Sequence, residues 1–249
     1  MKDKVIVITG ASGGIGAATA EAVAKRGASV VIVARREAEL RAVAERCGAR
    51  TLAIVADVTR RDEVRRVVNE SLAKFGRIDV WMNNVGQGIT RKPTELTDED
   101  IDEAMRVNVK PALYGMQEVL PHFASRGEGH IINVSSMLGR IPFAIIRSAY
   151  NGAKHYLNAL TANFRTEVQA TYPGIQFSIV SPGVVRTDFG LNARHGGPDS
   201  RSFPESQSAE EVAEVIAGVI ESRLPDVYTR VGAHQRVASY YASLGTDPA

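Results

Sequence analysis

A tyrosine and a lysine stand four residues apart in the segment Tyr150-Asn-Gly-Ala-Lys154. In a helix, this spacing places both side chains on one face. A free tyrosine has a pKa of about 10, which is too high for efficient proton transfer near neutral pH. A neighbouring ammonium, or the positive charge of an oxidised nicotinamide, would favour the phenolate and lower that pKa. The pair therefore predicts a proton-transfer site, although the spacing alone is common by chance.

Two serines follow an apolar run upstream of this pair, in Asn133-Val-Ser-Ser-Met-Leu-Gly139. A hydroxyl at the carboxyl end of a parallel strand lies on the ligand side of the sheet. Ser136 is then placed to donate a hydrogen bond to a substrate carbonyl oxygen on which negative charge develops. Ser135 fits better as a residue that caps the strand end.

A glycine-rich turn follows the first apolar run of the chain. Its residues are Thr9, Gly10, Ala11, Ser12, Gly13, Gly14, Ile15 and Gly16. The turn opens a predicted helix, whose first N–H groups and positive dipole end favour a phosphate. Glycine permits both the tight turn and the close approach of backbone to a pyrophosphate. The spacing G-x-x-x-G-x-G differs from the common G-x-G-x-x-G fingerprint, so a purely structural turn is the alternative.

The second predicted strand ends in Val33-Ala34-Arg35-Arg36 and has no acidic residue at its tip. An acid at this position would bind the ribose 2′-hydroxyl of NAD, whereas a guanidinium can bind the 2′-phosphate of NADP. The sequence therefore favours NADP(H), with Arg35 as the first contact and Arg36 as the second. The alternative is that both arginines are solvated residues at a helix start.

Apolar runs alternate with longer amphipathic segments along the chain. The runs predict strands at Val5–Thr9, Val30–Ala34, Leu52–Ala56, Ile78–Met82, Ile131–Ser135, Phe177–Ser181 and Val227–Val231. The amphipathic segments predict helices at Gly14–Arg26, Glu37–Cys47, Arg60–Phe75, Asp98–Arg126, Ser148–Ala170 and Ala209–Arg223. Ser208 and Glu211 have the spacing of a capping box at the start of the last helix. This alternation predicts an α/β fold: a Rossmann-type, doubly wound parallel sheet of about seven strands with helices on both faces.

We expect one domain over residues 1–249. The one long stretch without periodicity, Gly190–Gln207, follows a strand, where α/β folds place loops that cover a ligand. It predicts a substrate lid, and a plain connection is the alternative. The final residues, Gly245–Ala249, predict a disordered tail.

Composition excludes several classes of function. The chain of 249 residues has a net charge of +2 and is 44% hydrophobic, which is typical of a globular protein without a dense basic surface for nucleic acid. No apolar run approaches the roughly 20 residues of a membrane span or the length of a secretory leader. Five histidines and one cysteine show no metal-ligand spacing. We therefore expect a cytoplasmic protein with no metal site and no nucleic-acid or membrane partner.

In combination, these residues resemble the short-chain dehydrogenase/reductase family over nearly the whole chain. The motifs that carry the resemblance are the glycine turn of residues 9–16, Asp57-Val58, Asn83-Asn-Val-Gly86, Asn108, Ser136, Tyr150 with Lys154, and Pro182-Gly183. The resemblance implies a catalytic tetrad of Asn108, Ser136, Tyr150 and Lys154. In that tetrad Tyr150 transfers the proton, and Ser136 polarises the carbonyl. Lys154 binds the nicotinamide ribose and lowers the tyrosine pKa, and Asn108 holds a water that links Lys154 to solvent.

The resemblance also implies further cofactor contacts. Asp57 and Val58 would contact the adenine ring, and the turn that contains Asn83, Asn84 and Gly86 would pack near the adenine ribose. Val185 and Thr187, which follow Pro182-Gly183, would hold the nicotinamide carboxamide. Asn83 and Asn84 are otherwise ordinary turn residues.

The chain departs from the family pattern in four respects. Ser136 and Tyr150 are fourteen residues apart, one more than expected, and the extra residue falls in the Arg140–Ser148 loop. Val85 replaces the usual alanine, and Asn151-Gly152 replaces the usual small residues after the tyrosine. The frequent Val-Asp-Gly-Gly segment near the C-terminus is missing. These departures affect the substrate pocket and the oligomer interface more than the chemistry.

The expected function is hydride transfer between NADP(H) and a small carbonyl or alcohol substrate. Ile141, Phe143, Ile145, Ile146 and Phe189 suggest an apolar pocket wall and hence a hydrophobic substrate. One alternative is a non-catalytic NADP(H)-binding sensor or scaffold, which would have little need of Tyr150 or Lys154. Another reaction on the same fold, such as dehydration or epimerisation, is a third. The resemblance also implies a homodimer or homotetramer formed through the Asp98–Arg126 and Ser148–Ala170 helices.

Overall fold

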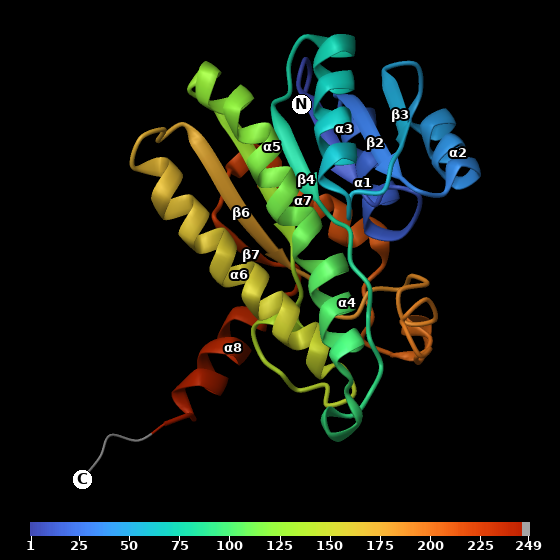
Figure 1. Cartoon of the computed structure of the whole chain (residues 1–249), viewed down its shortest axis with the longest axis vertical. Coiled ribbons are helices and arrows are strands. Elements are labelled where there is room, and N and C mark those ends of the chain that lie inside the picture. The colour runs from blue at the N-terminus through green and yellow to red at the C-terminus, as the bar shows by residue number, and fades with distance from the viewer. Residues whose placement is uncertain (246–249) are drawn as a thin grey trace.

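Seven parallel strands form one sheet at the centre of the protein. A computed structural model describes residues 1–245 of the chain (Figure 1). The strands are β1 (Val5–Thr9), β2 (Ser29–Ala34), β3 (Thr51–Val55), β4 (Val80–Asn83), β5 (Gly129–Val134), β6 (Ile175–Ser181) and β7 (Asp226–Tyr228). Their order in the sheet is β3-β2-β1-β4-β5-β6-β7, and every neighbouring pair is parallel. The predicted doubly wound Rossmann-type fold is therefore confirmed.

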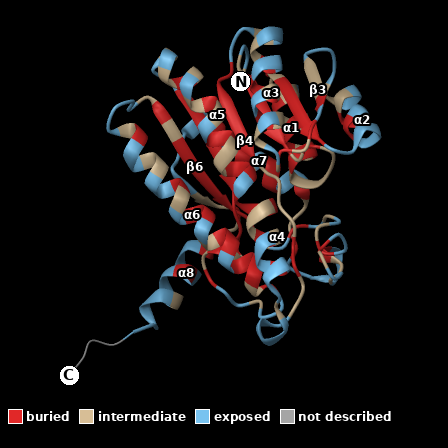
Figure 2. Cartoon of the chain, viewed as in Figure 1, coloured by how far each residue is buried: buried red, intermediate tan, exposed pale blue. Residues whose placement is uncertain are grey.

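Helices cover both faces of the sheet. They are α1 (Gly14–Lys25), α2 (Glu37–Cys47), α3 (Arg61–Phe75), α4 (Asp98–Asn108), α5 (Lys110–Arg126), α6 (Ser148–Gln169), α7 (Ala209–Ser222) and α8 (Ala233–Ala242). Apolar residues of α1, α2 and α7 pack on one face, and those of α3, α5 and α6 pack on the other. Figure 2 shows the strands as the most deeply buried layer between them.

The apolar runs form strands because both of their faces are covered. Along β1, Ile6 and Ile8 join the core beneath α1 and α7, whereas Val5 and Val7 join the core beneath α3 and α5. Alternate side chains of a strand point to opposite faces, so a strand between two helical layers must be apolar throughout. Because β1 and β4 are neighbours with crossovers leading in opposite directions, their carboxyl ends border the crevice in which such folds bind ligands.

The structure corrects three predicted elements. The single helix expected over Asp98–Arg126 is two helices, because Val109 (φ −118°, ψ −55°) lies outside the usual helical range of φ and because Pro111, which has no N–H to donate, lies in the first turn of α5. Helix α8 was not predicted. It packs Ala233 and Val237 against Met137 and Ile141. The seventh strand is shorter than expected and ends at Tyr228.

The Gly190–Gln207 segment is anchored rather than free along its length. Its short 3-10 turn is Ser200–Ser202. Arg194 forms an isolated parallel bridge with Ile89, and the Gln87 side chain donates to the Asn192 carbonyl oxygen at 3.1 Å. The segment therefore covers the chain that follows β4, and its role as a lid stays a prediction. Of the predicted tail Gly245–Ala249, residues 246–249 lie outside the described residues.

Within residues 1–245, the helices are all too short or too polar to cross a membrane. The same residues contain no group of three or more side chains that could hold a metal ion.

Candidate active site

The glycine turn joins β1 to α1 and has a backbone that only glycine adopts readily. Gly10 and Gly14 have φ of +69° and +54°, in the left-handed region. A side chain at Gly16 would collide with the carbonyl oxygen of Gly10. Helix α1 has no side-chain cap and no acidic residue in its first turn. The N–H groups that begin α1 are thus left for a ligand, and their partial positive charge suits the pyrophosphate of a dinucleotide.

Side chains from other strand ends hold this turn in place. The Asn84 amide donates to the carbonyl oxygens of Thr9 and Gly10, each at 3.2 Å. The Thr9 hydroxyl accepts from the backbone N–H of Asn84 at 3.1 Å. On the opposite side, the Thr187 methyl group lies 3.1 Å from where a Cβ on Gly14 would be. The ends of β1 and β4 and the segment after β6 therefore meet around the turn.

The two arginines after β2 point in different directions. Arg36 lies over the glycine turn and donates from Nη2 to the Ser12 hydroxyl at 3.0 Å. It also pairs with Glu39 at 3.3 Å. Arg35 is exposed, and its side chain makes no hydrogen bond or ion pair with any residue in 1–245. Arg36 is therefore held by acceptors within the protein, whereas Arg35 extends into solvent.

Lys154, Asn108 and Gly86 lie together at the carboxyl end of β5. The Lys154 ammonium is buried and donates to the Val134 carbonyl oxygen at 2.9 Å. The Asn108 amide at the end of α4 accepts from the Gln87 N–H at 2.9 Å and donates to the Gln87 carbonyl oxygen at 3.1 Å. A Cβ on Gly86 would lie 3.0 Å from Asn108 Oδ1 and 3.4 Å from Lys154 Nζ. A glycine at position 86 therefore lets the chain pass close to both side chains.

Tyr150 lies on the same face of α6 as Lys154, as the spacing predicted. Its ring is 6% exposed and packs edge-on against Phe189, with centroids 5.4 Å apart. The Lys154 ammonium is 5.7 Å from the centre of the Tyr150 ring. The Ser136 hydroxyl caps the turn after β5 by accepting from the Leu138 N–H at 3.1 Å. Tyrosine, serine and lysine thus converge at the carboxyl edge of the sheet.

The expected lowering of the tyrosine pKa is not found in the protein alone. Burial raises the pKa of Tyr150 to about 12, against the lowering effects of the Ser136 hydroxyl and the Arg147 charge. Burial likewise lowers the pKa of Lys154 to about 8, because the ammonium has left water without gaining a carboxylate. At neutral pH both groups keep their protons, so Tyr150 is a phenol that can donate one.

The remaining predicted contacts fall into two groups. Val58 is buried, Asp57 accepts from the Thr59 N–H at 3.1 Å in the turn after β3, and the Pro182 carbonyl oxygen accepts from Met137 at 2.8 Å. These residues, with Gly183 and buried Val185, lie at carboxyl strand ends. The Asn83 side chain instead points into the core, where it accepts from Trp81 at 2.7 Å and donates to Asn133 at 2.8 Å. Its amide therefore holds β4, β5 and α5 together.

Most residues of the predicted pocket wall lie elsewhere. Ile141 is buried beneath α8, and Phe143 stacks with Arg236 of α8, with the guanidinium carbon 5.0 Å from the ring centre. Ile145 is 68% exposed and borders a shallow hollow with Pro93. Phe189 is the one that contacts Tyr150. The expected continuous apolar wall is therefore not formed by these five residues, because α8 takes up two of them.

Sequence reasoning missed Arg147 and Asp100. Arg147 precedes α6 and is 8% exposed. Asp100 is fully buried at the start of α4, where it accepts from His195 at 2.7 Å and pairs with Arg194 at 3.2 Å and Arg91 at 3.1 Å. This cluster fastens the Gly190–Gln207 segment to α4. The Thr97–Asp100 capping box was a local signal that could have marked Asp100.

The chain belongs to the short-chain dehydrogenase/reductase family. Residues 4–196 match the family described as short chain dehydrogenase. An uncharacterized oxidoreductase of Staphylococcus epidermidis is 34% identical over 187 residues, which cover 75% of this chain and 80% of that protein. The protein is thus an oxidoreductase of this family.

Solved structures share the fold. A short-chain dehydrogenase/reductase from Burkholderia phymatum in complex with NAD has a TM-score of 0.88 over 100% of this chain and 98% of its own, at 23% identity. An alcohol dehydrogenase from the archaeon Thermococcus sibiricus, complexed with 5-hydroxy-NADP, has a TM-score of 0.78 and is 27% identical. That match covers 90% of this chain and 95% of the other. Structures of this kind therefore hold nicotinamide cofactors of both types.

Proposed function

We propose that the protein is an NADP(H)-dependent carbonyl reductase in which Tyr150 is the general acid. The observation that carries this proposal is the meeting of Tyr150, Ser136 and Lys154 beside the uncapped start of α1. A sensor or scaffold would need the glycine turn alone. In this protein a proton donor, Tyr150, and a hydroxyl that can bind the substrate oxygen, Ser136, lie at the same edge of the sheet as the glycine turn.

The residues divide the work of carbonyl reduction between them. NADPH, when bound, supplies a hydride to the carbonyl carbon and is oxidised to NADP⁺. Ser136 donates a hydrogen bond to the carbonyl oxygen. As the hydride adds to the carbonyl carbon, the π electron pair of the C=O bond moves onto that oxygen, which becomes negatively charged. Tyr150 gives its phenolic proton to that oxygen, which yields the alcohol. Lys154 binds the nicotinamide ribose, and its charge stabilises the phenolate that remains.

In the protein alone, Tyr150 is in the protonation state that carbonyl reduction needs. With a pKa of about 12 in the protein alone, Tyr150 is a phenol at neutral pH and has a proton to give. Oxidation of an alcohol would need the phenolate, and hence a further positive charge beside it. Cellular NADP is mostly reduced, which also favours reduction.

A panel of ketones and aldehydes, followed by loss of NADPH absorbance, tests this function. Tyr150→Phe removes only the phenolic oxygen, so we expect kcat/KM to fall by about a thousandfold or more while NADPH binding stays within about twofold. Retained turnover in Tyr150→Phe would refute the role of Tyr150 as the acid. If the wild type reduced none of the carbonyl compounds, the result would instead favour a binding protein or another reaction.

The preference for NADP(H) rests on the strand tip at Ala34, which lacks an acid, and on Arg35 and Arg36. The double change Ala34→Asp and Arg35→Ala adds a ligand for the 2′-hydroxyl and removes a ligand for the 2′-phosphate. We expect the ratio of kcat/KM for NADPH over NADH to drop by about a hundredfold, from two effects of roughly tenfold each. Arg36→Ala is the companion variant, since Arg36 lies over Ser12. An unchanged ratio in both variants would show that neither arginine binds the phosphate.

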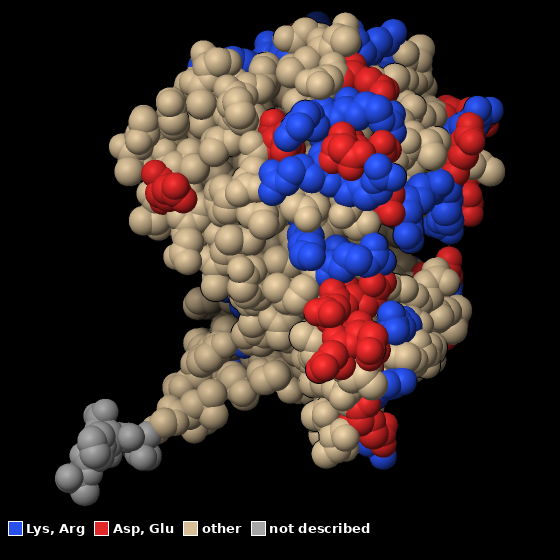
Figure 3. Space-filling model, viewed as in Figure 1, with Lys and Arg blue, Asp and Glu red and all other residues tan. Residues whose placement is uncertain are grey.

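Self-association of the protein is a further part of the proposal. Figure 3 shows that charged side chains gather over α3 and α4, while the surface over α6 has very few. A face with little charge suits burial against a second copy. We expect a dimer or tetramer through α5 and α6 in sedimentation velocity at micromolar concentration, and a monomer under those conditions would refute it.

A further inference from the structure

Arg147 is a buried positive charge without a counter-ion. The residue is 8% exposed, and its Nη1 atom is fully buried with no hydrogen-bond acceptor among residues 1–245. No carboxylate in that range forms an ion pair with it, although twenty-two other ion pairs are found there. An isolated buried charge is expensive and is normally paired or hydrogen-bonded. The free protein therefore bears a cost that a bound anion would remove.

Two glycines close around this guanidinium. A Cβ on Gly88 would collide with Nη1, and a Cβ on Gly197 would lie 2.6 Å from Nη2. The same Gly197 position is 3.1 Å from the Thr90 hydroxyl, which is also buried without a partner. Arg147 and Thr90 thus bring two unused hydrogen-bonding groups to one place. With Gly88 and Gly197, these residues come from three separate segments of the chain.

This place adjoins the reacting groups. Arg147 precedes Tyr150 by three residues, and its charge acts on the phenol. Gly88 belongs to the turn whose Gly86 passes Lys154 and Asn108. Gly197 belongs to the segment that begins directly after Phe189, the residue packed on the Tyr150 ring. The guanidinium is therefore enclosed by the two segments that border Tyr150.

We propose that Arg147 binds a carboxylate of the substrate, so that the protein reduces oxo acids in which a few bonds separate the carboxylate from the carbonyl. The proposal rests on the proposed carbonyl reduction and names its substrate class. A guanidinium is planar and can donate two parallel hydrogen bonds to a carboxylate, which fixes the direction of the substrate as well as its charge. Phe189 then contacts the apolar part of the same molecule.

Pairs of substrates that differ only in the carboxylate show how much its charge contributes to recognition. We would compare 3-benzoylpropionate with its methyl ester, and benzoylformate with its methyl ester, as NADPH-dependent substrates. The wild type should favour at least one acid over its ester by about tenfold to a hundredfold in kcat/KM, which is the range for a charge-assisted pair. In Arg147→Met, the preference for that acid over its ester should disappear, and any change in kcat/KM common to both substrates reports the effect of the Arg147 charge on the Tyr150 phenol. Arg147→Lys should retain part of the preference.

A matched control removes another positive charge that contacts the Arg140–Ser148 loop. Arg236 of α8 stacks on Phe143 and forms no ion pair in the described part of the chain. Arg236→Met should keep the preference for the acid. Equal kcat/KM for acid and ester in the wild type would overturn the proposal. So would an equal loss for both in Arg147→Met, because that result assigns Arg147 only to the support of the Tyr150 proton or of the loop.

An equilibrium titration keeps this proposal separate from the proposed reaction. Calorimetry would measure 3-benzoylpropionate, benzoylformate and their methyl esters binding to wild-type protein saturated with NADP⁺. Binding of an acid but not its ester, lost in Arg147→Met with a thermal midpoint equal to or above that of the wild type, would support the carboxylate site even if no carbonyl were reduced. Reduction of neutral ketones with no binding preference for the acids would leave the reductase in place and refute the carboxylate site.

Discussion

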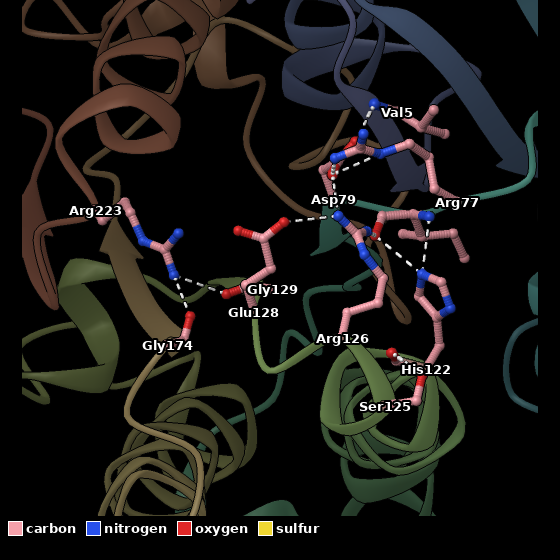
Figure 4. Close-up of polar contacts among 11 residues, drawn as sticks. Val5, Arg77, Asp79, His122, Ser125, Arg126, Glu128, Gly129, Gly174 and Arg223 are labelled. Carbon is pink, nitrogen blue, oxygen red and sulfur yellow. Dashed lines mark hydrogen bonds and ion pairs between the residues drawn. The ribbon is translucent and has the colours of Figure 1, made fainter.

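The two edges of the sheet treat buried charge in opposite ways. At the amino ends of the strands, Asp79 is buried and accepts from the Val5 N–H at 2.8 Å, from Arg77 at 3.0 Å and from Arg126 at 3.2 Å (Figure 4). At the carboxyl ends, buried Lys154 has one carbonyl oxygen as its acceptor, and buried Arg147 has no ion-pair partner among residues 1–245. Asp79 is therefore saturated with donors, whereas Lys154 and Arg147 beside Tyr150 have one acceptor and no ion-pair partner, respectively.

The same contrast extends to the neighbours of these charges. Arg126 also donates to the Ile78 carbonyl oxygen at 2.7 Å, and Arg223 donates to the carbonyl oxygens of Gly129 and Gly174 at 2.9 and 2.7 Å (Figure 4). At the carboxyl edge, the Ser135 hydroxyl is buried without a partner. Buried polar groups whose hydrogen bonds are all made stabilise a fold. Buried polar groups without a partner lower the free energy of unfolding, and the surrounding structure must hold them in place. The difference indicates that the charges around Asp79 serve stability, whereas Lys154 and Arg147 remain free to interact with bound molecules.

Asp79→Asn should have the largest effect on stability and little effect on catalysis. The change removes one buried negative charge and leaves two arginines and a backbone N–H with a poorer acceptor. Loss of one partner from such a buried cluster costs about 3 kcal/mol. We expect urea unfolding at pH 7 to show this loss, with kcat/KM for NADPH-dependent reduction within about twofold of the wild type at 25 °C.

The exposed carboxylate in the same cluster provides the control. Glu128 accepts from Arg126 at 2.7 Å, but its side chain is 58% exposed. Glu128→Gln should therefore cost less than about 1 kcal/mol, as is usual for surface pairs. A loss in Asp79→Asn no greater than in this control would contradict the structural role of the amino edge.

Acidification gives a second check on Asp79. Hydrogen bonds from Arg77, Val5 and Arg126 outweigh burial and hold the pKa of Asp79 below its usual value of 3.8. Its contribution to folding is therefore complete above the unfolded pKa and is lost as pH falls through the folded one. The stability gap between wild type and Asp79→Asn should be constant from pH 7 to about 5 and narrow below pH 4.

The elements of the fold were predictable where one local pattern decides them. Strands such as β1 and β2 are apolar on both faces, and the box formed by Ser208 and Glu211 marks the start of α7 as predicted. Helix α8 gave no comparable signal, because only Ala233 and Val237 of its ten residues are buried. The break at Val109 did have a signal in the sequence, because a proline such as Pro111 disfavours a helix that begins before it. The continuous helix was predicted because this signal was not weighed.

The motifs of the candidate site could be predicted from the sequence, but the burial of its charged residues could not. Tyr150, Lys154, Ser136 and the glycine turn are identified by type and spacing, and the fold brings them together. The burial of Arg147 depends on Gly88 and Gly197, which are 59 and 50 residues distant in sequence. No local pattern shows that these segments will meet, so a buried arginine looks like any other loop arginine.

Lys154→Met tests the carboxyl edge with the opposite expectation. Burial without a carboxylate lowers the pKa of Lys154 from 10.5 to about 8, which corresponds to about 3 kcal/mol of cost for the charged form. Methionine fills a similar volume without charge and gives up one hydrogen bond worth about 1 kcal/mol. The variant should therefore be about 2 kcal/mol more stable than the wild type at pH 7 in urea unfolding, although kcat/KM falls by about a hundredfold or more.

The pH dependence of this gain identifies its cause. Below pH 8 Lys154 is protonated in both the folded and the unfolded wild type, so the cost is at its full value. Between about pH 8 and 10.5 only the unfolded state keeps the proton, so the wild type gains stability as pH rises and the advantage of Lys154→Met shrinks. Lys74→Met, on the exposed face of α3, should show neither effect. If Lys154→Met proved less stable than the wild type by more than about 1 kcal/mol at pH 7, Lys154 would belong with Asp79 as a structural charge. The contrast between the two edges would then rest on Arg147 alone.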